Sequence, residues 1–267
     1  MATLAARVVP LPIFGSRRAR FLIERNLLVY RRSWVVFLSG FVEPVFYLFS
    51  IGVGIGALVP TVEVGGKAIP YASFVAPAML ASAAMNGAVF DATFNVFFKL
   101  KYAKLYDAVL ATPIGTGDVA LGEITWALIR GAVYAFGFVL VMLAMGLVES
   151  VWAVLSLPAA ILIGFTFGAV GMAGTTFFRS WQDFEWVTIV TLPMFLFSAT
   201  FYPLSTYPGY LQPIVAATPL YQGVALIRGL TTGAVSAGLL WHVLYLAVLG
   251  VAGLAIASRR LEHLLLK

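Results

Sequence analysis

Residues 151–178 read VWAVLSLPAAILIGFTFGAVGMAGTTFF, a run of 28 residues without Asp, Glu, Lys or Arg. A helix that crosses the ~30 Å hydrocarbon core of a bilayer needs about 20 mostly apolar residues. This stretch is long enough, and it leaves no charged side chain to be placed in lipid. It therefore predicts a transmembrane helix.

Further apolar stretches lie on both sides of it, at residues 34–59, 71–98, 121–147, 186–202 and 239–257. The whole chain is 61% hydrophobic and 10% charged, with a mean hydropathy of +0.98. Soluble domains carry about 25% charged residues, so a chain this apolar cannot cover a water-facing surface. The sequence predicts an all-α polytopic membrane protein with six transmembrane helices.

Two segments outside these spans have their own patterns. Residues 16–33 place apolar side chains at helical spacing between arginines, which indicates an amphipathic helix at the membrane surface or, alternatively, a basic flank that orients the first span. Residues 203–236 are apolar but divided by four prolines into pieces too short to cross a bilayer. We expect these pieces to form re-entrant extracellular helices between helices 5 and 6.

The distribution of basic residues predicts the orientation. Of the 17 Lys and Arg residues, 14 lie in segments that share a side with the N-terminus, while Lys67 and Arg228 fall on the other side. Basic residues concentrate on the cytoplasmic side of membrane proteins. We therefore expect both termini to be cytosolic, with residues 1–14 as a short tail rather than a removable signal. The net charge of +6 lies beside apolar spans and indicates membrane lipid, not nucleic acid, as its partner.

Motifs for catalysis or cofactor binding are missing from the sequence. Absence of cysteine excludes disulfides and thiolate chemistry, and the two histidines stand apart. No phosphate-binding loop is present, and the glycines of residues 52–56 lie inside an apolar span. Gly52 with Gly56, and Gly164 with Gly168, instead form G-x-x-x-G pairs typical of close helix packing. We expect no catalytic site, metal or cofactor in this chain.

Three charged residues fall inside predicted spans: Glu43, Asp91 and Arg130. At 1.5 Å rise per residue, each lies roughly 10–13 Å from the cytosolic end of its span. Ionised groups at such depth normally find partners. We expect Arg130 to pair with Glu43, Asp91 or both, either as a fastener of three helices or as a polar element that moves during transport. The Glu43-Pro44 pair also predicts a bend in the first span.

The polar segment at residues 99–118 lies between two spans on the cytosolic side. Residues 101–111 predict a short helix that stops before Pro113, and Asp118 can cap the start of the next span. Such a helix is equally consistent with a lever for a partner protein and with an ordinary solvated loop.

Several motifs, in order along the chain, resemble those of the ABC-2 family of exporter permeases. The likeness is greatest to the branch that contains nodulation lipo-oligosaccharide and daunorubicin-type drug exporters. The motifs that carry it are Glu43-Pro44 with Tyr47, the YASFVAPAM of residues 71–79, Phe90-Asp91, the YDAVLATP of residues 106–113, Gly122-Glu123, the PMFLFS of residues 193–198, Phe201-Tyr202-Pro203, Thr218-Pro219 and Arg228.

The resemblance implies a permease that pairs with a second permease chain, identical or related, and with two separate ABC ATPase subunits that bind ATP and Mg. Residues 1–33 then hold a cytosolic tail and a connecting helix, residues 34–258 the ABC-2 transmembrane domain, and residues 259–267 a cytosolic tail. The residues implied to meet the ATPase belong to the coupling helix: Lys101, Lys104, Tyr106, Asp107 and Pro113.

The function that follows is export of an amphipathic substrate (a lipid-linked saccharide, glycolipid or drug) across the bacterial cytoplasmic membrane, driven by the partner ATPases. Candidate pathway-lining residues are aromatic and lie toward the outer half of the spans, although each is also consistent with packing or lipid contact: Tyr47, Phe197, Phe201 and Tyr202. Two other functions fit the composition. An ion-coupled secondary transporter usually shows broken spans in both halves, and here the interruption is one-sided; a non-transporting scaffold subunit would purify without an ATPase.

Overall fold

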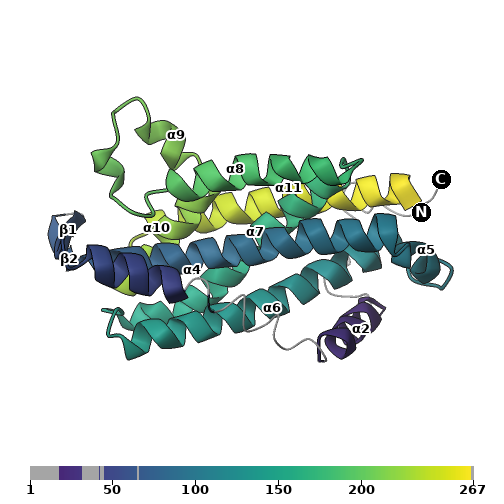
Figure 1. Ribbon diagram of the computed structural model, residues 1–267, viewed down its shortest axis with the longest axis horizontal. Helices are drawn as coiled ribbons and strands as arrows, with labels where there is room; N and C mark the ends of the chain where they lie inside the picture. Colours follow the sequence, from purple (N-terminus) through teal and green to yellow (C-terminus); the bar gives the residue numbers. More distant parts are fainter. Residues whose placement is uncertain (1–17, 32–41, 43–44, 65, 266–267) are drawn as a thin grey trace.

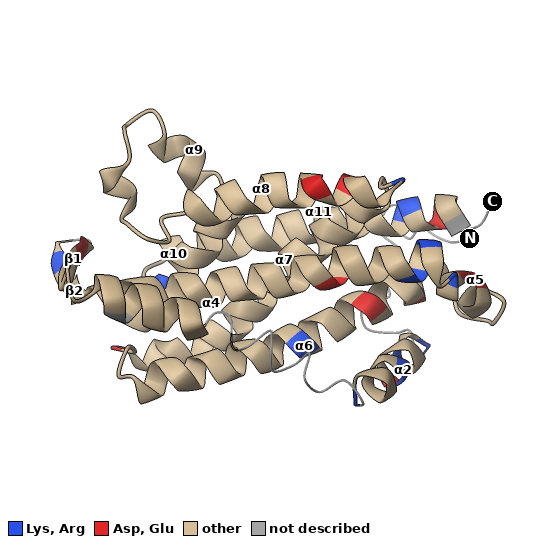
Figure 2. Cartoon of the chain, viewed as in Figure 1, with Lys and Arg blue, Asp and Glu red and all other residues tan. Residues whose placement is uncertain are grey.

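The computed structural model describes residues 18–31, 42, 45–64 and 66–265. Its helices lie side by side along one direction (Figure 1). Charged residues gather at the end that carries α2, α5 and the C-terminal part of α11, whereas the middle of the bundle is almost uncharged (Figure 2). An apolar middle between polar ends is the arrangement that a bilayer requires.

Four of the predicted spans are confirmed as helices long and apolar enough to cross a membrane: Tyr71–Tyr102, Thr116–Ala144, Val151–Thr175 and Gly238–Leu264. The first comprises α4 (Tyr71–Phe90) and two π-helical turns, η2 (Asp91–Asn95) and η3 (Phe98–Tyr102). The others are α6 (Thr116–Ala144), the 3₁₀ turn η4 (Val151–Leu155) with α7 (Ser156–Thr175), and α11 (Gly238–Leu265). At 1.5 Å per residue, each exceeds the ~30 Å of a hydrocarbon core.

The centre of the bundle is α4, in which 15 of the 20 residues are buried. It packs against α6, α7 and α10 (Pro219–Thr232). A helix that is apolar on every face is a buried helix, and the many alanines of α4 let neighbouring backbones approach closely. The first span was predicted at residues 34–59, but much of it lies outside the described residues, including Glu43 and the predicted bend at Pro44. Its described end is a helix that continues into the π-helical η1 (Leu48–Ile55).

The predicted surface helix is present as α2 (Ala19–Arg31). It lies against α6 near the charged end of the bundle (Figure 1). Its buried residues are Leu22 and Asn26, whereas Phe21 and Leu28 are exposed. Because one face packs on protein and apolar side chains remain on another, α2 has the character of an interfacial helix.

Residues between the first two predicted spans form a β-hairpin, so the all-α expectation needs this correction. Strands β1 (Thr61–Val64) and β2 (Lys67–Pro70) pair antiparallel, with Val62 opposite Ile69. Gly66 in the connecting turn has φ +81°, which a glycine adopts without strain. Lys67 then forms a 2.8 Å ion pair with Glu149, which ties the hairpin to the connection between α6 and η4.

The fifth predicted span, residues 186–202, is helical over only part of its length. Helix α8 (Glu185–Leu196) has 12 residues, or about 18 Å at the α-helical rise, and the chain is irregular beyond it. Short fragments follow between the prolines: η6 (Leu204–Thr206), α9 (Gln212–Ala216) and α10. Fragmentation by proline is as predicted, and membrane re-entry of these pieces and the count of six crossings stay predictions.

The cytosolic helix predicted at residues 101–111 is shorter than expected. Lys101 belongs to η3, the end of the preceding span, and Lys104 has φ +45°, which breaks the helix before α5 (Leu105–Leu110). Asp118 was expected to cap the next span from its first position. Helix α6 begins two residues earlier, so Asp118 caps it from the first turn, where its carboxylate accepts a 3.0 Å hydrogen bond from the Gly115 amide.

Candidate functional site

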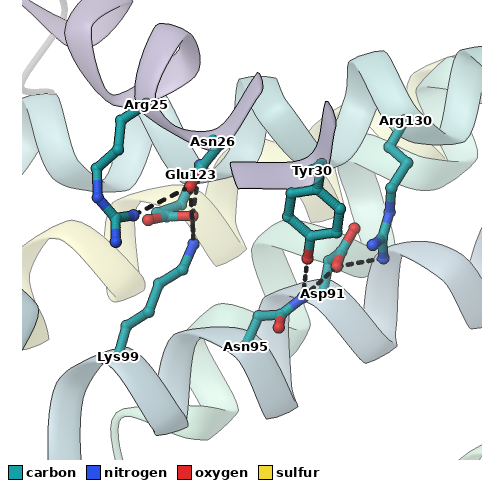
Figure 3. Close-up of polar contacts among 8 residues, drawn as sticks. All are labelled: Arg25, Asn26, Tyr30, Asp91, Asn95, Lys99, Glu123 and Arg130. Atoms are coloured by element: carbon teal, nitrogen blue, oxygen red, sulfur yellow. Dashed lines mark hydrogen bonds and ion pairs between the residues drawn. The ribbon is translucent and has the colours of Figure 1, made fainter. Parts of the chain in front are cut away.

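A polar seam of eight side chains runs between α2, the C-terminal part of the second span and α6 (Figure 3). Helix α2 contributes three of them, the η2–η3 region three and α6 two. They are Arg25, Asn26 and Tyr30; Asp91, Asn95 and Lys99; and Glu123 and Arg130. The seam therefore joins the surface helix to two membrane-crossing helices.

The π-helical turns explain why three polar residues of one helix can reach the same neighbours. Residues 90–102 read FDATFNVFFKLKY, in which Asp91, Asn95 and Lys99 recur every four positions. In an α-helix, residues four apart drift by about 40° around the axis, since a turn takes 3.6 residues. A π-turn, with its i→i+5 bonds, is wider and cancels this drift. Asp91, Asn95 and Lys99 thus face α2 and α6 together (Figure 3), while the rings of Phe90 and Phe94, and of Phe98 and Tyr102, stack in pairs.

The deeper half of the seam, the Asp91 cluster, is an almost fully buried charge pair with polar support. Arg130 forms an ion pair with Asp91, and their side chains are 4% and 5% exposed. Asn95 donates hydrogen bonds to Asp91 at 2.5 Å and to the Tyr30 hydroxyl at 3.1 Å. The Arg130 guanidinium also lies 5.3 Å from the centroid of the Tyr30 ring. The predicted pairing of Arg130 with Asp91 is present, and Glu43 lies outside the described residues.

The shallower half, the Glu123 cluster, was not recognised as a site from sequence. Lys99 Nζ lies 2.6 Å from Glu123 Oε2. Asn26 bridges the two, because its Nδ2 donates to Glu123 Oε2 and its Oδ1 accepts from Lys99 Nζ, both at 3.3 Å. Arg25 donates to the same Asn26 oxygen at 3.3 Å. In the sequence, Lys99 opens the polar segment between two predicted spans, and Glu123 belongs only to a family-like motif. Their spacing from Asp91 and Arg130, eight and seven residues, was the signal that could have placed them on the same faces.

The coupling candidates divide into one anchor and four exposed residues. Tyr106 is 1% exposed and packs in a second apolar core with Leu22 of α2 and Val119 of α6. Burial raises the pKa of Tyr106 well above its usual value, and the nearby Glu123 carboxylate adds to this shift. The others face solvent: Lys101, Lys104, Asp107 and Pro113. Helix α5 is thus fixed to the seam at Tyr106 while its charged side chains remain accessible.

A further contact joins α2 to the α5 connection directly. Arg18, just before α2, donates a hydrogen bond to the carbonyl oxygen of Pro113. The start of α2 and the connection after α5 therefore contact each other as well as the spans.

The aromatic lining candidates belong to two groups of three rings near the end of α8, one around Phe195 and one around Tyr207. Tyr47 and Phe201 both contact Phe195, with ring centroids 6.3 and 5.3 Å apart. Phe197 and Tyr202 both contact Tyr207, at 6.4 and 4.7 Å. Tyr47, Phe197 and Tyr202 are 38–45% exposed, so each keeps a free ring face. Contact with substrate stays a prediction for all four.

The arrangement is a set of ion pairs, hydrogen bonds and apolar contacts that joins helices to one another. Within the part of the chain that the structure describes, no group of three His, Asp or Glu residues could hold a metal ion. The site links the second span to α6 by two ion pairs, adds α2 through the hydrogen bonds of Asn26, and adds α5 through the packing of Tyr106. Together with the charge distribution, the four membrane-length apolar helices define a polytopic membrane protein.

Comparison with known proteins specifies the family. Residues 17–231 match the model of the ABC-2 type transporter family, which covers most of the chain. The chain belongs to the ABC-2 type transporter family, as a membrane permease of an ABC exporter. Membership implies association with ABC ATPase subunits, which agrees with the lack of a nucleotide-binding motif in the sequence.

Individual relatives are 25–28% identical to this chain over most of its length. Nodulation protein J of Rhizobium leguminosarum bv. viciae is 28% identical over 244 residues, which are 89% of this chain and 93% of that protein. Nodulation protein J of Rhizobium meliloti (strain 1021) is 28% identical over 212 residues, 79% of each chain. A probable doxorubicin resistance ABC transporter permease protein, DrrC of Mycobacterium tuberculosis (strain CDC 1551 / Oshkosh), is 25% identical over 233 residues, 80% of this chain and 78% of that protein.

Proposed function

We propose that this chain exports an amphipathic substrate, a lipid-linked saccharide, glycolipid or drug, across the bacterial cytoplasmic membrane. It acts with a second permease chain and two ATPase subunits, which bind ATP and Mg. Residues 34–258 form the transmembrane domain with six crossings, and residues 1–33 and 259–267 lie on the cytosolic side. Doxorubicin is a reasonable probe because the name of one relative associates that protein with doxorubicin resistance.

The polar seam is the observation that carries the proposal. Tyr106 anchors α5 beside Glu123, and Glu123 is bonded to Lys99 and Asn26. A push on α5 by an ATPase subunit therefore reaches η3, α6 and α2 through contacts that are buried and charge-assisted. Such contacts are stiff enough to transmit displacement, because breaking a buried pair is costly.

The exposure of α8 supports the proposal that a second permease chain is present. None of the 12 residues of α8 is buried in the single chain. Trp186, Ile189 and Leu192 are 53–64% exposed. Lipid covers such a face in a monomer, and a second permease chain would bury part of it in the complex.

The test is coupled transport by the complete complex. The chain is co-expressed with its partner ABC ATPase, reconstituted in liposomes, and assayed for ATP-dependent doxorubicin transport. The variant K101E/K104E/D107N changes three exposed charges on and beside α5. We expect transport to fall about tenfold or more, which corresponds to a coupling loss of ~1.4 kcal/mol, with little change in thermal stability.

A matched control changes an exposed lysine at the other end of the molecule. Lys67→Glu lies in the β-hairpin, where its 2.8 Å ion pair with Glu149 is exposed and contributes little. The complex that carries Lys67→Glu should transport doxorubicin at the wild-type rate. Unchanged transport by the triple variant would refute the coupling role, and doxorubicin uptake driven by an ion gradient without the ATPase would favour the secondary transporter instead.

A further inference from the structure

Arg228 is a buried cation that the seam does not use. It lies on α10, is 8% exposed, and sequence reasoning had assigned it to the outer loops. In the described part of the chain, no carboxylate lies within ion-pair distance of it. A buried charge without a partner of opposite sign must be stabilised by dipoles, so its hydrogen bonds are the ones to examine.

The guanidinium connects two backbone segments that are far apart in sequence. Nε and Nη2 donate to the carbonyl of Phe74 at 3.2 and 3.1 Å, and Nη2 also donates to the carbonyl of Ala199 at 2.8 Å. The charge lies 3.8 Å from the centroid of the Phe74 ring. One arginine thus joins α4, α10 and the chain just after α8. A lysine, with a single point charge, cannot reproduce this fork.

The segment at the far end of this bridge is irregular and buried. Residues 197–202 follow the end of α8, and Ser198, Ala199 and Thr200 are at most 1% exposed. Non-helical backbone at membrane depth is tolerated only where protein satisfies its polar groups. Here Arg228 binds the Ala199 carbonyl, and the Tyr71 hydroxyl donates to the Phe201 carbonyl at 3.1 Å.

Ala199 is also strained. Its φ of +53° lies in the left-handed region, which is unfavourable for any residue with a Cβ. A strained residue persists only where its surroundings hold it. The 2.8 Å hydrogen bond from Arg228 acts on the carbonyl of Ala199 itself, whereas the side chains of Ser198 and Thr200 hold its two neighbours.

We propose that Arg228 is a positioning residue for export: it holds residues 197–202 against α4, and through them the rings of Phe197, Phe201 and Tyr202. The inference rests on the proposed function for the role of these rings in the pathway, but its structural part stands by itself. Without the guanidinium, the backbone of Ala199 leaves the left-handed region and residues 197–202 move away from α4.

The chain contains no cysteine, so an introduced cysteine is the only thiol of this chain that a reagent can modify. Ser198→Cys is introduced into the full chain, in complex with its ATPase, and the rate of modification by a small membrane-impermeant thiol reagent is measured. We expect Arg228→Gln to raise the rate about tenfold, the order set by the left-handed strain it releases, and Arg228→Lys to give an intermediate rate. Val224→Cys, fully buried on the same helix, should stay unreactive in every background.

A second substitution isolates the strain. Glycine adopts a positive φ freely, so Ala199→Gly added to Arg228→Gln should return the modification rate of Ser198→Cys toward the wild-type value. An unchanged rate in Arg228→Gln, no return with Ala199→Gly, or an equal increase at Val224→Cys would each overturn the inference. The last result would mean that α10 itself has loosened.

Transport separates this inference from the proposed function. In liposomes with doxorubicin as probe, we expect Arg228→Gln to raise KM more than it lowers kcat, with partial rescue by Arg228→Lys. If the wild-type complex transports no amphipathic probe, the proposed function fails while the thiol measurements still decide the positioning role. If wild type transports and Arg228→Gln shows the same kinetics, the positioning role fails alone.

Discussion

At the scale of single residues, the buried pair of Asp91 and Arg130 is the part of the seam most sensitive to the loss of one charge. Both side chains are at least 95% buried, and Asn95 and the Tyr30 ring complete their surroundings. Removing two charges from water costs several kcal/mol per ion, which their attraction offsets only in good geometry. The pair therefore adds little net stability, but each member makes the other tolerable. Lys99, 14% exposed, keeps some contact with solvent and depends less on Glu123.

The first prediction follows from this dependence. Asp91→Asn keeps the shape and leaves the Arg130 guanidinium buried without a counter-charge. We expect the free energy of unfolding to fall by about 3–5 kcal/mol. Thermal unfolding of the purified protein in detergent measures the change.

The control for charge removal is Asp107→Asn, because Asp107 is exposed and its change should stay within about 0.5 kcal/mol. The double variant Asp91→Asn with Arg130→Met should recover much of the loss, since neither charge is then buried alone. Equal losses in the single and double variants would show that the pair is not coupled.

At the scale of elements, helix contacts depend on glycines other than those in the G-x-x-x-G pairs. A Cβ on Gly164 or Gly168 would meet its nearest neighbours at 3.5 and 3.8 Å, which is ordinary contact. On Gly253 of α11, a Cβ would lie 2.8 Å from the backbone nitrogen of Val170 in α7. Among the described glycines, Gly253 therefore makes the closest approach to the backbone of another helix. Spacing alone cannot reveal it, because it depends on how each helix is rotated toward its neighbour.

The second prediction tests this contact. Gly253→Ala forces α7 and α11 apart, since backbone cannot move aside as a flexible side chain can. We expect a loss of about 1–3 kcal/mol, the usual cost of overpacking. The measurement is again thermal unfolding.

Gly131→Ala is the matched control. Gly131 is also helical, on α6, but a Cβ there would meet nothing within 4 Å. Because alanine has a higher helix propensity than glycine, Gly131→Ala should raise the free energy of unfolding by up to ~1 kcal/mol. Equal effects of the two substitutions would refute the close contact of α7 with α11.

At the scale of the whole molecule, the two ends of the bundle differ in charge and in structure. Helices α2 and α5 lie at one end, while the β-hairpin and α9 lie at the other (Figures 1 and 2). The hydrophobic spans separate these ends, so one end must face the cytosol if the chain crosses the membrane as predicted. The excess of Lys and Arg at the α5 end favours that end.

The third prediction concerns this sidedness. Lys104→Cys and Tyr210→Cys are each introduced into the cysteine-free chain; both positions are exposed. In intact cells, an impermeant maleimide should modify Tyr210→Cys, and Lys104→Cys only after the membrane is opened. The reverse pattern would invert the topology and, with it, the ATPase-facing role of α5.

Much of the molecule followed from the sequence alone. Long apolar runs, basic asymmetry and proline spacing predicted four spans that the structure confirms as membrane-length helices, the surface helix α2 and the fragmented segment before α11. The depth of Asp91 and Arg130 also predicted their pairing. Each of these depends on properties that sum along the chain, namely hydrophobicity, charge and the local backbone limits of proline.

Tertiary structure decided the rest. The pairing of Lys99 with Glu123, the burial of Arg228 and the end of α8 at Leu196 depend on contacts between segments distant in sequence. The π-turns that align Asp91, Asn95 and Lys99 change helix rotation by amounts that periodicity does not resolve. Apolar length determines that a segment enters the membrane, because transfer from water acts on each residue separately. Which polar groups meet there depends on the mutual rotation and register of the packed helices.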